Sequence, residues 1–483
     1  MSIHQHYIGG AWEAGADTLP VLNPSDGQEM ARIARGGAAE IDRAVRAAQG
    51  ALDGAWGRLD AAARGRLMLR LADLIRRDRE SLARLESEDV GKPMSLARSD
   101  VDFAARYFEY YGGAADKVHG DTIPFQNGYT VMTVWEPHGV TGHIVPWNYP
   151  IQMTGRSVAP ALAMGNAAVL KPAEDTSLSA LALARLAEEA GFPAGAFNVV
   201  TGLGEEAGAA LSAHPGIGHI SFTGSTEVGT LIQSAAARNT IPVTLELGGK
   251  SPQVVFADAN LDDAAGTITR GITQNSGQTC SAGSRVLVEE RVYDRFMDEL
   301  SARFRALRVG AASQDLDLGP VVNAAQKRRV EGYIDLAKDL ATDGGGPRIL
   351  AQGEIGTNVP ADGFYVRPTL IGDVPPDHRL AQEEIFGPVL VAIRVRDEAE
   401  ALSVANGTPY GLAAGIWTSD IGRALRLAHR VRSGQVFINN YGAGGGVELP
   451  FGGVKRSGHG REKGFEALYG CATLKTVAIK QGL

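Results

Sequence analysis

One cysteine of the chain lies in a segment of small residues that could expose a thiol to a reactant. Cys280 stands in GQTCSAGSR, residues 277–285, just before a predicted strand. A thiolate in such a turn can act as a nucleophile. Free cysteine is also among the most buried residue types, so Cys280 taken alone fits a structural thiol better. The residues that the fold brings beside it must decide between the two roles.

Two other polar side chains have the chemistry to assist a thiol. Glu246 ends the predicted strand of LELGG, where glycines let the backbone turn beside a ligand and the carboxylate could act as a general base. Asn148 lies in PWNYP, where two prolines stiffen the loop and a fixed side-chain amide could stabilise an oxyanion. Alone, Glu246 fits a salt-bridge or capping residue, and Asn148 fits an ordinary turn residue.

Two motifs indicate a phosphate and ribose site. FTGSTEVG, residues 222–229, places Gly224 and Gly229 at a strand-to-helix junction, where backbone N–H groups can bind a phosphate. The motif is not GxGxxG, and glycines at such a junction often serve close packing alone. In LKPAE, Lys171 and Glu174 could hold ribose hydroxyls, although a surface ion pair has the same spacing.

The elements around these motifs alternate between short apolar runs and helical stretches, which predicts parallel sheets covered by helices. In the first region, to about residue 256, we expect strands at 140–145, 167–170, 197–200, 219–222, 243–245 and 253–256, with helices at 177–190 and 205–213. A second region, 261–436, has strands at 284–288, 389–394 and 435–439. Ligands should bind at the carboxyl ends of such strands.

Further helices and one separate strand are expected before the first region. Apolar residues recur at helical spacing from Ile41 to Leu52 and from Leu67 to Leu85, which predicts two amphipathic helices. Alternation from Tyr129 to Trp135 predicts a strand with one covered face, in an arm or at an edge.

Composition excludes several classes of function. The 483 residues, 44% hydrophobic and 21% charged, are enough for two or three domains. With 47 basic and 55 acidic residues, a net charge of -8 and no basic stripe, the chain is not expected to bind nucleic acid. It shows neither a signal peptide nor a membrane-spanning run, so we expect a cytoplasmic protein. Two isolated cysteines and no Cys/His cluster predict neither a disulfide framework nor a metal site.

Taken together, these motifs resemble those of the aldehyde dehydrogenase superfamily. The resemblance runs from Asn23-Pro24 to LKTV, residues 474–477, and includes PWNYP, LKPAE, FTGSTEVG, ELGGKSP, GQTCSAGSR, EEIFGPV, PYGL and PFGGVKRSG in the family's order. It implies an α/β fold with a Rossmann-like cofactor domain at 1–117 and 138–248. A catalytic α/β domain would follow at 249–448, and a β oligomerisation arm would comprise 118–137 and 465–483. A homodimer or homotetramer is therefore expected.

The resemblance also implies roles for single residues. Cys280 would be the nucleophile, Glu246 the general base, and Asn148 with the Cys280 N–H the oxyanion hole, while Glu462 of GREKG would lie near the water and proton path. Cys471 matches no functional position. The cofactor NAD would contact residues of several motifs: Trp147, Lys171, Glu174, Gly224, Ser225, Gly229, Glu384 and Phe386. Tyr149, Arg156 and Gln274 would face the substrate.

The resemblance leaves alternatives open for the acyl acceptor, the cofactor and the substrate. Glu246 favours water over coenzyme A as the acyl acceptor, and the Glu174 carboxylate favours NAD over NADP, whose 2′-phosphate it would repel. Arg156 could bind a substrate carboxylate, as in semialdehyde enzymes, or form a salt bridge within its helix. A second arginine of those enzymes is replaced by Gln274, so the aldehyde could be aromatic, long-chain or a semialdehyde. A non-catalytic protein on the same scaffold is disfavoured by the intact Cys280, Glu246, Asn148 and Lys171.

Overall fold

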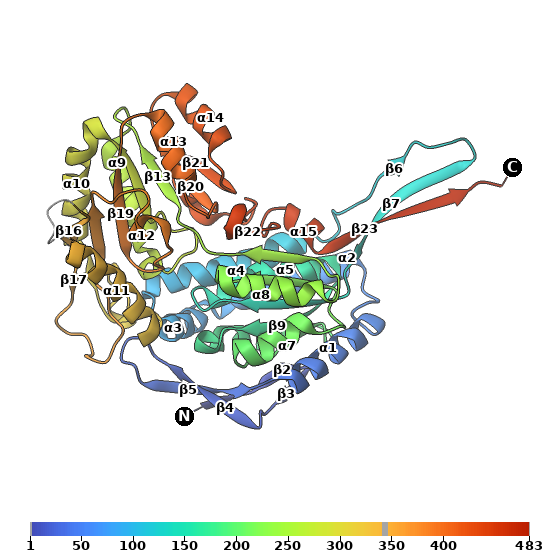
Figure 1. The fold of residues 1–483 in the computed structure, drawn as a ribbon. Coiled ribbons are helices and arrows are strands. Elements are labelled where there is room, and N and C mark those ends of the chain that lie inside the picture. Colours follow the sequence, from blue (N-terminus) through green and yellow to red (C-terminus); the bar gives the residue numbers. More distant parts are fainter. Residues whose placement is uncertain (1, 341–345, 483) are drawn as a thin grey trace.

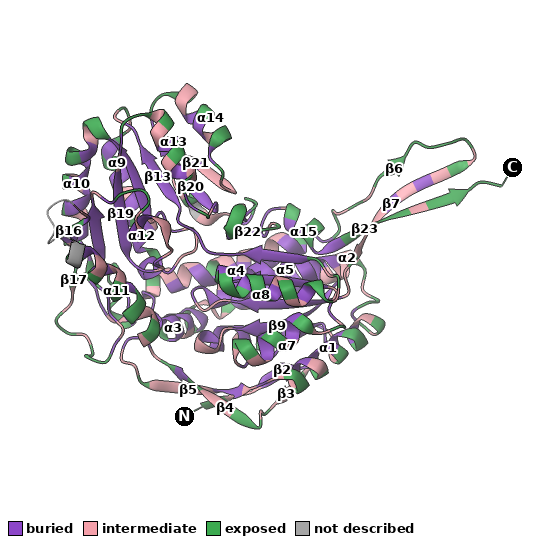
Figure 2. Cartoon of the chain, viewed as in Figure 1, coloured by how far each residue is buried: buried purple, intermediate pink, exposed green. Residues whose placement is uncertain are grey.

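The computed structural model describes residues 2–340 and 346–482. Two helix-covered sheets lie next to each other, and a narrow arm of strands projects from one of them (Figure 1). The predicted α/β class is confirmed. Both sheets are almost wholly buried, whereas exposed residues follow the outer helices and the arm (Figure 2).

The first sheet has eight strands, and its five central strands run parallel, as their apolar runs predict. β22 joins one edge antiparallel to β12, and β2 and β3 form the other edge. In spatial order the strands are β22 (Gly458–His459), β12 (Val243–Glu246), β11 (His219–Thr223), β8 (Val140–Val145), β9 (Ala167–Pro172), β10 (Phe197–Val199), β2 (His6–Ile8) and β3 (Ala11–Glu13).

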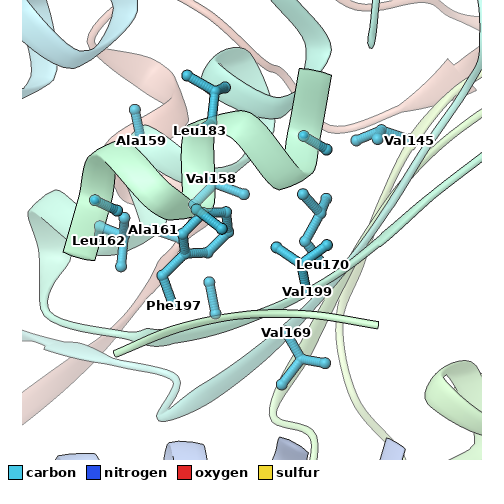
Figure 3. Packing of buried hydrophobic residues seen from close by; sticks show 14 of the residues in the cluster. Val145, Val158, Ala159, Ala161, Leu162, Val169, Leu170, Leu183, Phe197 and Val199 are labelled. Carbon is cyan, nitrogen blue, oxygen red and sulfur yellow. The ribbon is translucent and has the colours of Figure 1, made fainter. Parts of the chain in front are cut away.

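Helices cover this sheet and form its core. α5 packs on β8 and β9, and Val158 of α5, Leu170 of β9 and Phe197 of β10 belong to one buried cluster (Figure 3). The helices of this part are α1 (Ala38–Asp53), α2 (Ala61–Arg77), α3 (Arg79–Val90), α4 (Met94–Ala114), α5 (Pro150–Met164), α6 (Leu178–Ala190), α7 (Ala209–Ala213) and α8 (Thr226–Ala237).

The second sheet has seven strands, all parallel except β16 at one edge. Its order is β16 (Arg348–Gln352), β18 (Thr369–Gly372), β19 (Val389–Val395), β14 (Arg285–Glu289), β13 (Pro252–Val255), β20 (Ala413–Trp417) and β21 (Gln435–Ile438). Its helices are α9 (Leu261–Thr273), α10 (Tyr293–Ala306), α11 (Ala324–Leu340), α12 (Arg379–Gln382), α13 (Glu398–Asn406) and α14 (Ile421–Arg430).

Three expectations about the elements are wrong in detail. The strand expected at 253–256 belongs to the second sheet, because β13 pairs with β14 and β20 rather than with β12. The helix expected from Leu67 to Leu85 is two helices, because α2 ends and α3 begins at Asp78. The stretch 205–213 begins with π-helical turns before α7.

The two ends of the chain differ more from expectation. The start, where no element is expected from the sequence, contributes β2 and β3 to the first sheet and a separate small sheet of β1 (Ser2–His4), β5 (Glu29–Arg35) and β4 (Asp17–Leu22). A second small sheet pairs β15 (Arg308–Val309) with β17 (Glu354–Ile355). At the other end, residues expected in a strand after about 465 first form α15 (Glu466–Gly470).

The arm is a three-stranded antiparallel sheet of β6 (Thr122–Ile123), β7 (Tyr129–Pro137) and β23 (Ala472–Lys480). β7 contains the predicted strand 129–135, and it pairs with β23 from Tyr129–Lys480 to Pro137–Ala472. The three strands extend away from the body (Figure 1). Within the described residues, no helix has both the length and the apolar composition needed to cross a bilayer.

Candidate active site

The three residues singled out for chemistry come from distant parts of the sequence and meet at one cavity. Glu246 is the last residue of β12, Asn148 follows β8 just before α5, and Cys280 precedes β14. All three line a cavity of about 330 Å³. The first sheet thus contributes the Glu246 carboxyl group and the Asn148 amide, both from the C-terminal ends of its strands. The second part of the chain contributes the thiol.

The turn before Cys280 has an unusual backbone. Asn275 and Ser276 have φ angles of 48° and 54°, and Gly277 has 74°, so three successive residues lie in the left-handed region. A Cβ atom on Gly277 would lie 2.1 Å from the Gly387 carbonyl group. Glycine at 277 therefore allows GQTC and EEIFGPV to touch. This contact fixes the position of the turn that carries Cys280.

A second close contact ties the cysteine to the strand end of LELGG. A Cβ atom on Gly249 would lie 2.6 Å from the Cys280 carbonyl oxygen, and one on Gly248 would lie 2.4 Å from Glu384 Oε2. The Gly249 N–H donates to Glu384 Oε1 at 2.8 Å. The two glycines after Glu246 let three motifs pack without side chains between them.

The loop that carries Asn148 is anchored through the backbone carbonyl oxygen of Asn148. That oxygen accepts hydrogen bonds from Lys92 Nζ at 3.1 Å and Asn275 Nδ2 at 2.8 Å. Lys92 is buried between Glu86 and Asp100, at 3.1 and 2.5 Å. The Asn148 side-chain nitrogen donates one hydrogen to the Gln278 carbonyl at 2.8 Å. Its second hydrogen is free to bind a ligand oxygen.

Burial favours the protonated form of the Cys280 thiol. Burial raises the pKa of Cys280 to about 12, although Arg156 and a hydrogen bond from the Ser281 backbone favour the thiolate. In the part of the chain that the structure describes, no protein group accepts the Cys280 N–H. This N–H and the free Asn148 hydrogen are the two donors expected of an oxyanion hole.

Glu246 lies fully buried beside a cation. Burial raises the pKa of Glu246 well above its usual value, while Arg156 opposes that shift. Arg156 Nη2 lies 3.7 Å from Glu246 Oε2, and neither Glu246 oxygen has a hydrogen-bond partner among the described residues. A buried carboxyl group with free oxygens can take up a proton, as a general base must.

Arg156 also contacts the second glutamate named in the sequence. Its Nε lies 2.5 Å from Glu462 Oε2, and Ser221 Oγ donates to Glu462 Oε1 at 2.7 Å. Burial works against the charge on Arg156, yet Glu462 and Glu246 raise its pKa overall. Arg156 thus bridges two carboxyl groups, which favours the ion-pair interpretation over recognition of a substrate carboxylate.

The predicted cofactor residues fall into two groups. Trp147, Gly224, Ser225, Glu384 and Phe386 line the cavity of Cys280. The rings of Trp147 and Phe386 meet edge to face, with centroids 5.3 Å apart. Ser225 caps the N-terminus of α8 by accepting from the Val228 N–H, and burial raises the pKa of Glu384 to about 7.

Gly229, Lys171 and Glu174 do not line that cavity. A Cβ atom on Gly229 would lie 2.6 Å from Leu247, so this glycine serves close packing. Lys171 lies at the carboxyl end of β9, beside β8, and its Nζ is 2.7 Å from Glu174 Oε2. Lys171 is buried and Glu174 half-buried, so the pair is not an ordinary surface ion pair.

The predicted substrate residues line a different cavity. It measures about 370 Å³ and contains Tyr149, Arg156, Gln274 and Cys280 in its wall. The thiol therefore borders two cavities, one shared with Glu246 and Asn148 and one with the substrate residues. Tyr149 is fixed by a hydrogen bond between its hydroxyl and Thr279 Oγ1 at 2.7 Å.

Sequence reasoning missed three residues of this region: Lys92, Asn275 and Lys463. Lys463 directly follows Glu462 in GREKG, and a lysine beside a predicted active-site glutamate was a signal that could have been used. Burial, followed by Arg156, lowers the pKa of Lys463 to about 8. Lys92 and Asn275 act through a backbone carbonyl, which no sequence pattern indicates.

The fold and the site define a class of enzyme in which a buried thiol, an amide and a carboxyl group meet between two α/β parts. The chain belongs to the aldehyde dehydrogenase family, which matches residues 12–477. Hydroxyisobutyraldehyde dehydrogenase from Mycolicibacterium austroafricanum is 45% identical over 481 residues, 98% of this chain and 93% of that protein.

Solved structures are similar over the whole chain. A protein from Burkholderia cenocepacia has a TM-score of 0.97 and 60% identity, covering 99% of this chain and 100% of that one. Betaine aldehyde dehydrogenase from Staphylococcus aureus, crystallised with NAD+, has a TM-score of 0.95 and 35% identity, covering 99% and 95%.

Proposed function

We propose that the protein oxidises an aldehyde to a carboxylic acid with NAD, through a thioester on Cys280 that water hydrolyses. The observation that carries this proposal is the convergence of Cys280, Glu246 and Asn148 on one cavity. Family membership supports aldehyde oxidation in general. The residue roles rest on the geometry described above.

The cavity suits NAD in three respects. The N-terminus of α8, at Ser225, offers backbone N–H groups and a positive dipole end to a pyrophosphate. Lys171 and Glu174 lie outside the cavity wall, at the end of β9, two strands from β11, and would hold the adenosine ribose. Trp147, Phe386 and Glu384 border the end nearest to Cys280. When bound, NAD supplies the acceptor for the hydride of the aldehyde.

The chain's own residues perform the steps around that transfer. Cys280 Sγ bonds to the aldehyde carbon, and the thiol proton passes to one of the buried carboxyl groups or to water. The carbonyl oxygen becomes an oxyanion, which the Cys280 N–H and the free Asn148 hydrogen stabilise. Loss of one such donor typically costs about 3 to 4 kcal/mol in kcat. Lys92 and Asn275 are positioning residues, since they hold Asn148 by its carbonyl.

Hydrolysis of the thioester then requires a base. Glu246 takes a proton from water, the hydroxide oxygen bonds to the acyl carbon, and the C–S bond breaks to regenerate the thiol and release the acid. The pair of Arg156 and Glu462 would keep one positive charge between two carboxyl groups, so that Glu246 can lose and regain its proton. Glu462 therefore acts on the base and not on the substrate.

Several finer points belong to the same proposal. Glu246 favours water over coenzyme A, because the carboxyl group lies free beside the thiol. Aromatic rings in the substrate cavity favour an aromatic aldehyde over a long-chain one. The cytoplasmic location, the homo-oligomer and the division into domains at residues 117, 248 and 448 stay predictions. A non-catalytic role would not explain why both oxygens of the buried Glu246 lack a hydrogen-bond partner among the described residues.

Two variants test the proposal. Cys280→Ala should abolish oxidation of benzaldehyde, whereas Glu246→Gln should give one equivalent of NADH per active site in a burst and then stop, because the thioester forms but is not hydrolysed. Rapid-mixing absorbance at the NADH band measures both.

Cys471→Ala is the matched control. Cys471 is buried, lines neither cavity and has no role in the proposal, so this variant should keep its turnover at a modest cost in stability. An active Cys280→Ala enzyme would refute the assignment of the nucleophile.

A further inference from the structure

The wall of the substrate cavity is rich in aromatic rings. Six aromatic side chains form its wall: Phe103, Tyr107, Tyr149, Phe437, Tyr441 and Phe451. A volume of about 370 Å³ is at the lower end of the range for small-molecule sites. Rings of this kind favour a flat, conjugated ligand, because stacked and edge-to-face contacts add to the burial of apolar surface.

Lys463 is the one cation in this wall, besides the already paired Arg156, among the residues that the structure describes. Its residue surface is only 7% exposed. The ammonium group donates to the Gly445 carbonyl at 2.9 Å and lies 5.6 Å from the centre of the Phe451 ring. No carboxylate oxygen of the described chain lies within 4.0 Å of it, since no salt bridge involves this lysine. An ammonium group has three hydrogens, so two remain for a ligand.

The acidic groups near this lysine already have other partners. Glu462 pairs with Arg156 at 2.5 Å, and Glu448 pairs with Arg106 at 2.5 Å. Glu246 faces Arg156. Burial of an ammonium group without a counterion is unfavourable, and the carboxylate of a ligand would provide the missing charge.

The backbone also holds this side chain in place. Lys463 has a φ angle of 62°, in the left-handed region that lysine rarely adopts. Strain of this kind persists where the surrounding structure fixes it, and such positions cluster at ligand sites. Phe451 pairs with Glu462 through two backbone hydrogen bonds of 2.7 and 2.8 Å, which holds the residue before Lys463 against the cavity wall.

We propose that Lys463 is a substrate-recognition residue that pairs with a carboxylate at the far end of a flat, conjugated aldehyde whose formyl group reaches Cys280. The inference rests on the proposed function and names the substrate class of the same site. Arg156, held by two glutamates, is not the partner of this carboxylate.

A pair of aldehydes that differ only in charge tests the inference without any variant. Benzaldehyde and 4-formylbenzoate share the ring and the formyl group, and the second adds a carboxylate opposite the formyl carbon. We expect kcat/KM to be about 10 to 100 times higher for 4-formylbenzoate, the range of a charge-assisted hydrogen bond. Equal values, or a preference for benzaldehyde, would overturn the inference while leaving the proposed oxidation intact.

Variants then assign the preference to the lysine. Lys463→Met should lower the ratio of the two kcat/KM values at least about tenfold, and Lys463→Arg should restore part of it, because arginine keeps the charge. Lys338→Met, an exposed lysine on α11 paired with Asp335, is the matched control and should keep the wild-type ratio. A Lys463→Met enzyme whose ratio is unchanged, or whose two kcat/KM values fall equally, would contradict recognition.

A binding measurement separates this inference from the proposed function. Calorimetry on the wild-type protein with terephthalate and with benzoate should show terephthalate binding about 10 times more tightly. If no aldehyde were oxidised, the proposed function would fail, and this comparison would still decide whether Lys463 binds a carboxylate. Tighter binding of benzoate would overturn the inference.

Discussion

Cys280 and Glu246 are both acids whose uncharged form burial favours, although each must lose its proton to act. Burial raises the pKa of Cys280 to about 12 and the pKa of Glu246 well above its usual value. Arg156 is the principal opposing charge for both groups. Burial therefore favours the protonated form of both groups, and ligands that add positive charge or exclude water will change their ionisation.

The pH dependence of the reaction follows from these shifts. Deprotonation of buried acids becomes more complete as pH rises, so kcat/KM for benzaldehyde should increase between about pH 6 and about pH 9, by up to about tenfold per unit where one group limits. Steady-state rates at constant ionic strength measure the profile. Because benzaldehyde is neutral, titration of Lys463 does not affect its binding directly. A flat profile, or one that falls with pH, would contradict the protonated form of both groups.

The proposed preference for NAD over NADP rests on one side chain, Glu174. Burial disfavours the charge of Glu174, but the ion pair with Lys171 lowers its pKa overall, so the group is a carboxylate at neutral pH. It should repel the 2′-phosphate of NADP, and kcat/KM should favour NAD. Glu174→Gln should reduce the preference about tenfold or more, which corresponds to about 1.4 kcal/mol. Glu331→Gln, at an exposed position on α11, is the control. A wild-type enzyme that prefers NADP would refute the role assigned to Glu174.

Single residues are predictable from sequence where a motif carries them and not where their partners are distant. The motifs identified Cys280, Glu246 and Asn148, and the structure brings these three to one cavity. The alternatives for Arg156 stayed open in the sequence, because its partners Glu246 and Glu462 lie far away along the chain. Lys463 was overlooked although it directly follows Glu462, because the lack of a carboxylate beside its ammonium group, among the described residues, is visible only in coordinates.

At the scale of elements, the turn between α9 and β14 decides where the thiol lies. Gly277→Ala would place a methyl group against the Gly387 carbonyl, 2.1 Å away, at a φ angle of 74°. We expect a loss of stability of about 1 to 3 kcal/mol and a larger proportional loss of kcat, because the turn must shift. Thermal unfolding and turnover measure the two effects.

The control for this variant is a glycine in a helix. Gly332 lies in α11 with open space around it, so Gly332→Ala should stabilise the protein by up to about 1 kcal/mol and leave turnover unchanged. If Gly277→Ala were as stable and active as Gly332→Ala, the close contact of the two motifs would not matter for catalysis.

The elements themselves were largely predictable, and the errors have local causes. Strands buried on both faces appear as short apolar runs, so β8, β9, β11 and β19 were located within a residue or two. Such runs do not reveal which sheet a strand joins, and β13 was assigned to the wrong one. The break between α2 and α3 at Asp78 interrupts an apolar spacing that continues on both sides.

At the scale of the whole molecule, the arm is the surface that the body does not cover. It exposes apolar side chains that a monomer would leave in water: Ile123, Phe125, Tyr129, Leu474 and Ile479. Exposed apolar groups gathered on a projecting sheet mark a protein interface. The expected homodimer or homotetramer therefore has a physical basis in this sheet.

Charge on the arm should dissociate the oligomer. The double variant Leu474→Asp and Ile479→Asp should weaken association by about 3 to 6 kcal/mol, because two apolar side chains lose their burial. Sedimentation velocity over a range of concentrations measures the change. Ile421→Asp, at an exposed position on α14, is the control. A wild-type protein that is monomeric at all concentrations would contradict the interface.

The path of the chain also sets an order of events during synthesis. Glu462 and Lys463 reach the active site only after the entire second sheet, when β22 returns to the edge of the first sheet beside Glu246. A ribosome-bound chain could fold much of the first sheet, with Asn148 and Glu246 in place, before the nucleophile emerges 34 residues after Glu246. Glu462, the second carboxyl partner of Arg156, emerges later still. A chain that ends before β22 thus contains Cys280, Glu246 and Asn148 but lacks Glu462, so the charge network around Arg156 is complete only after the second sheet has been made.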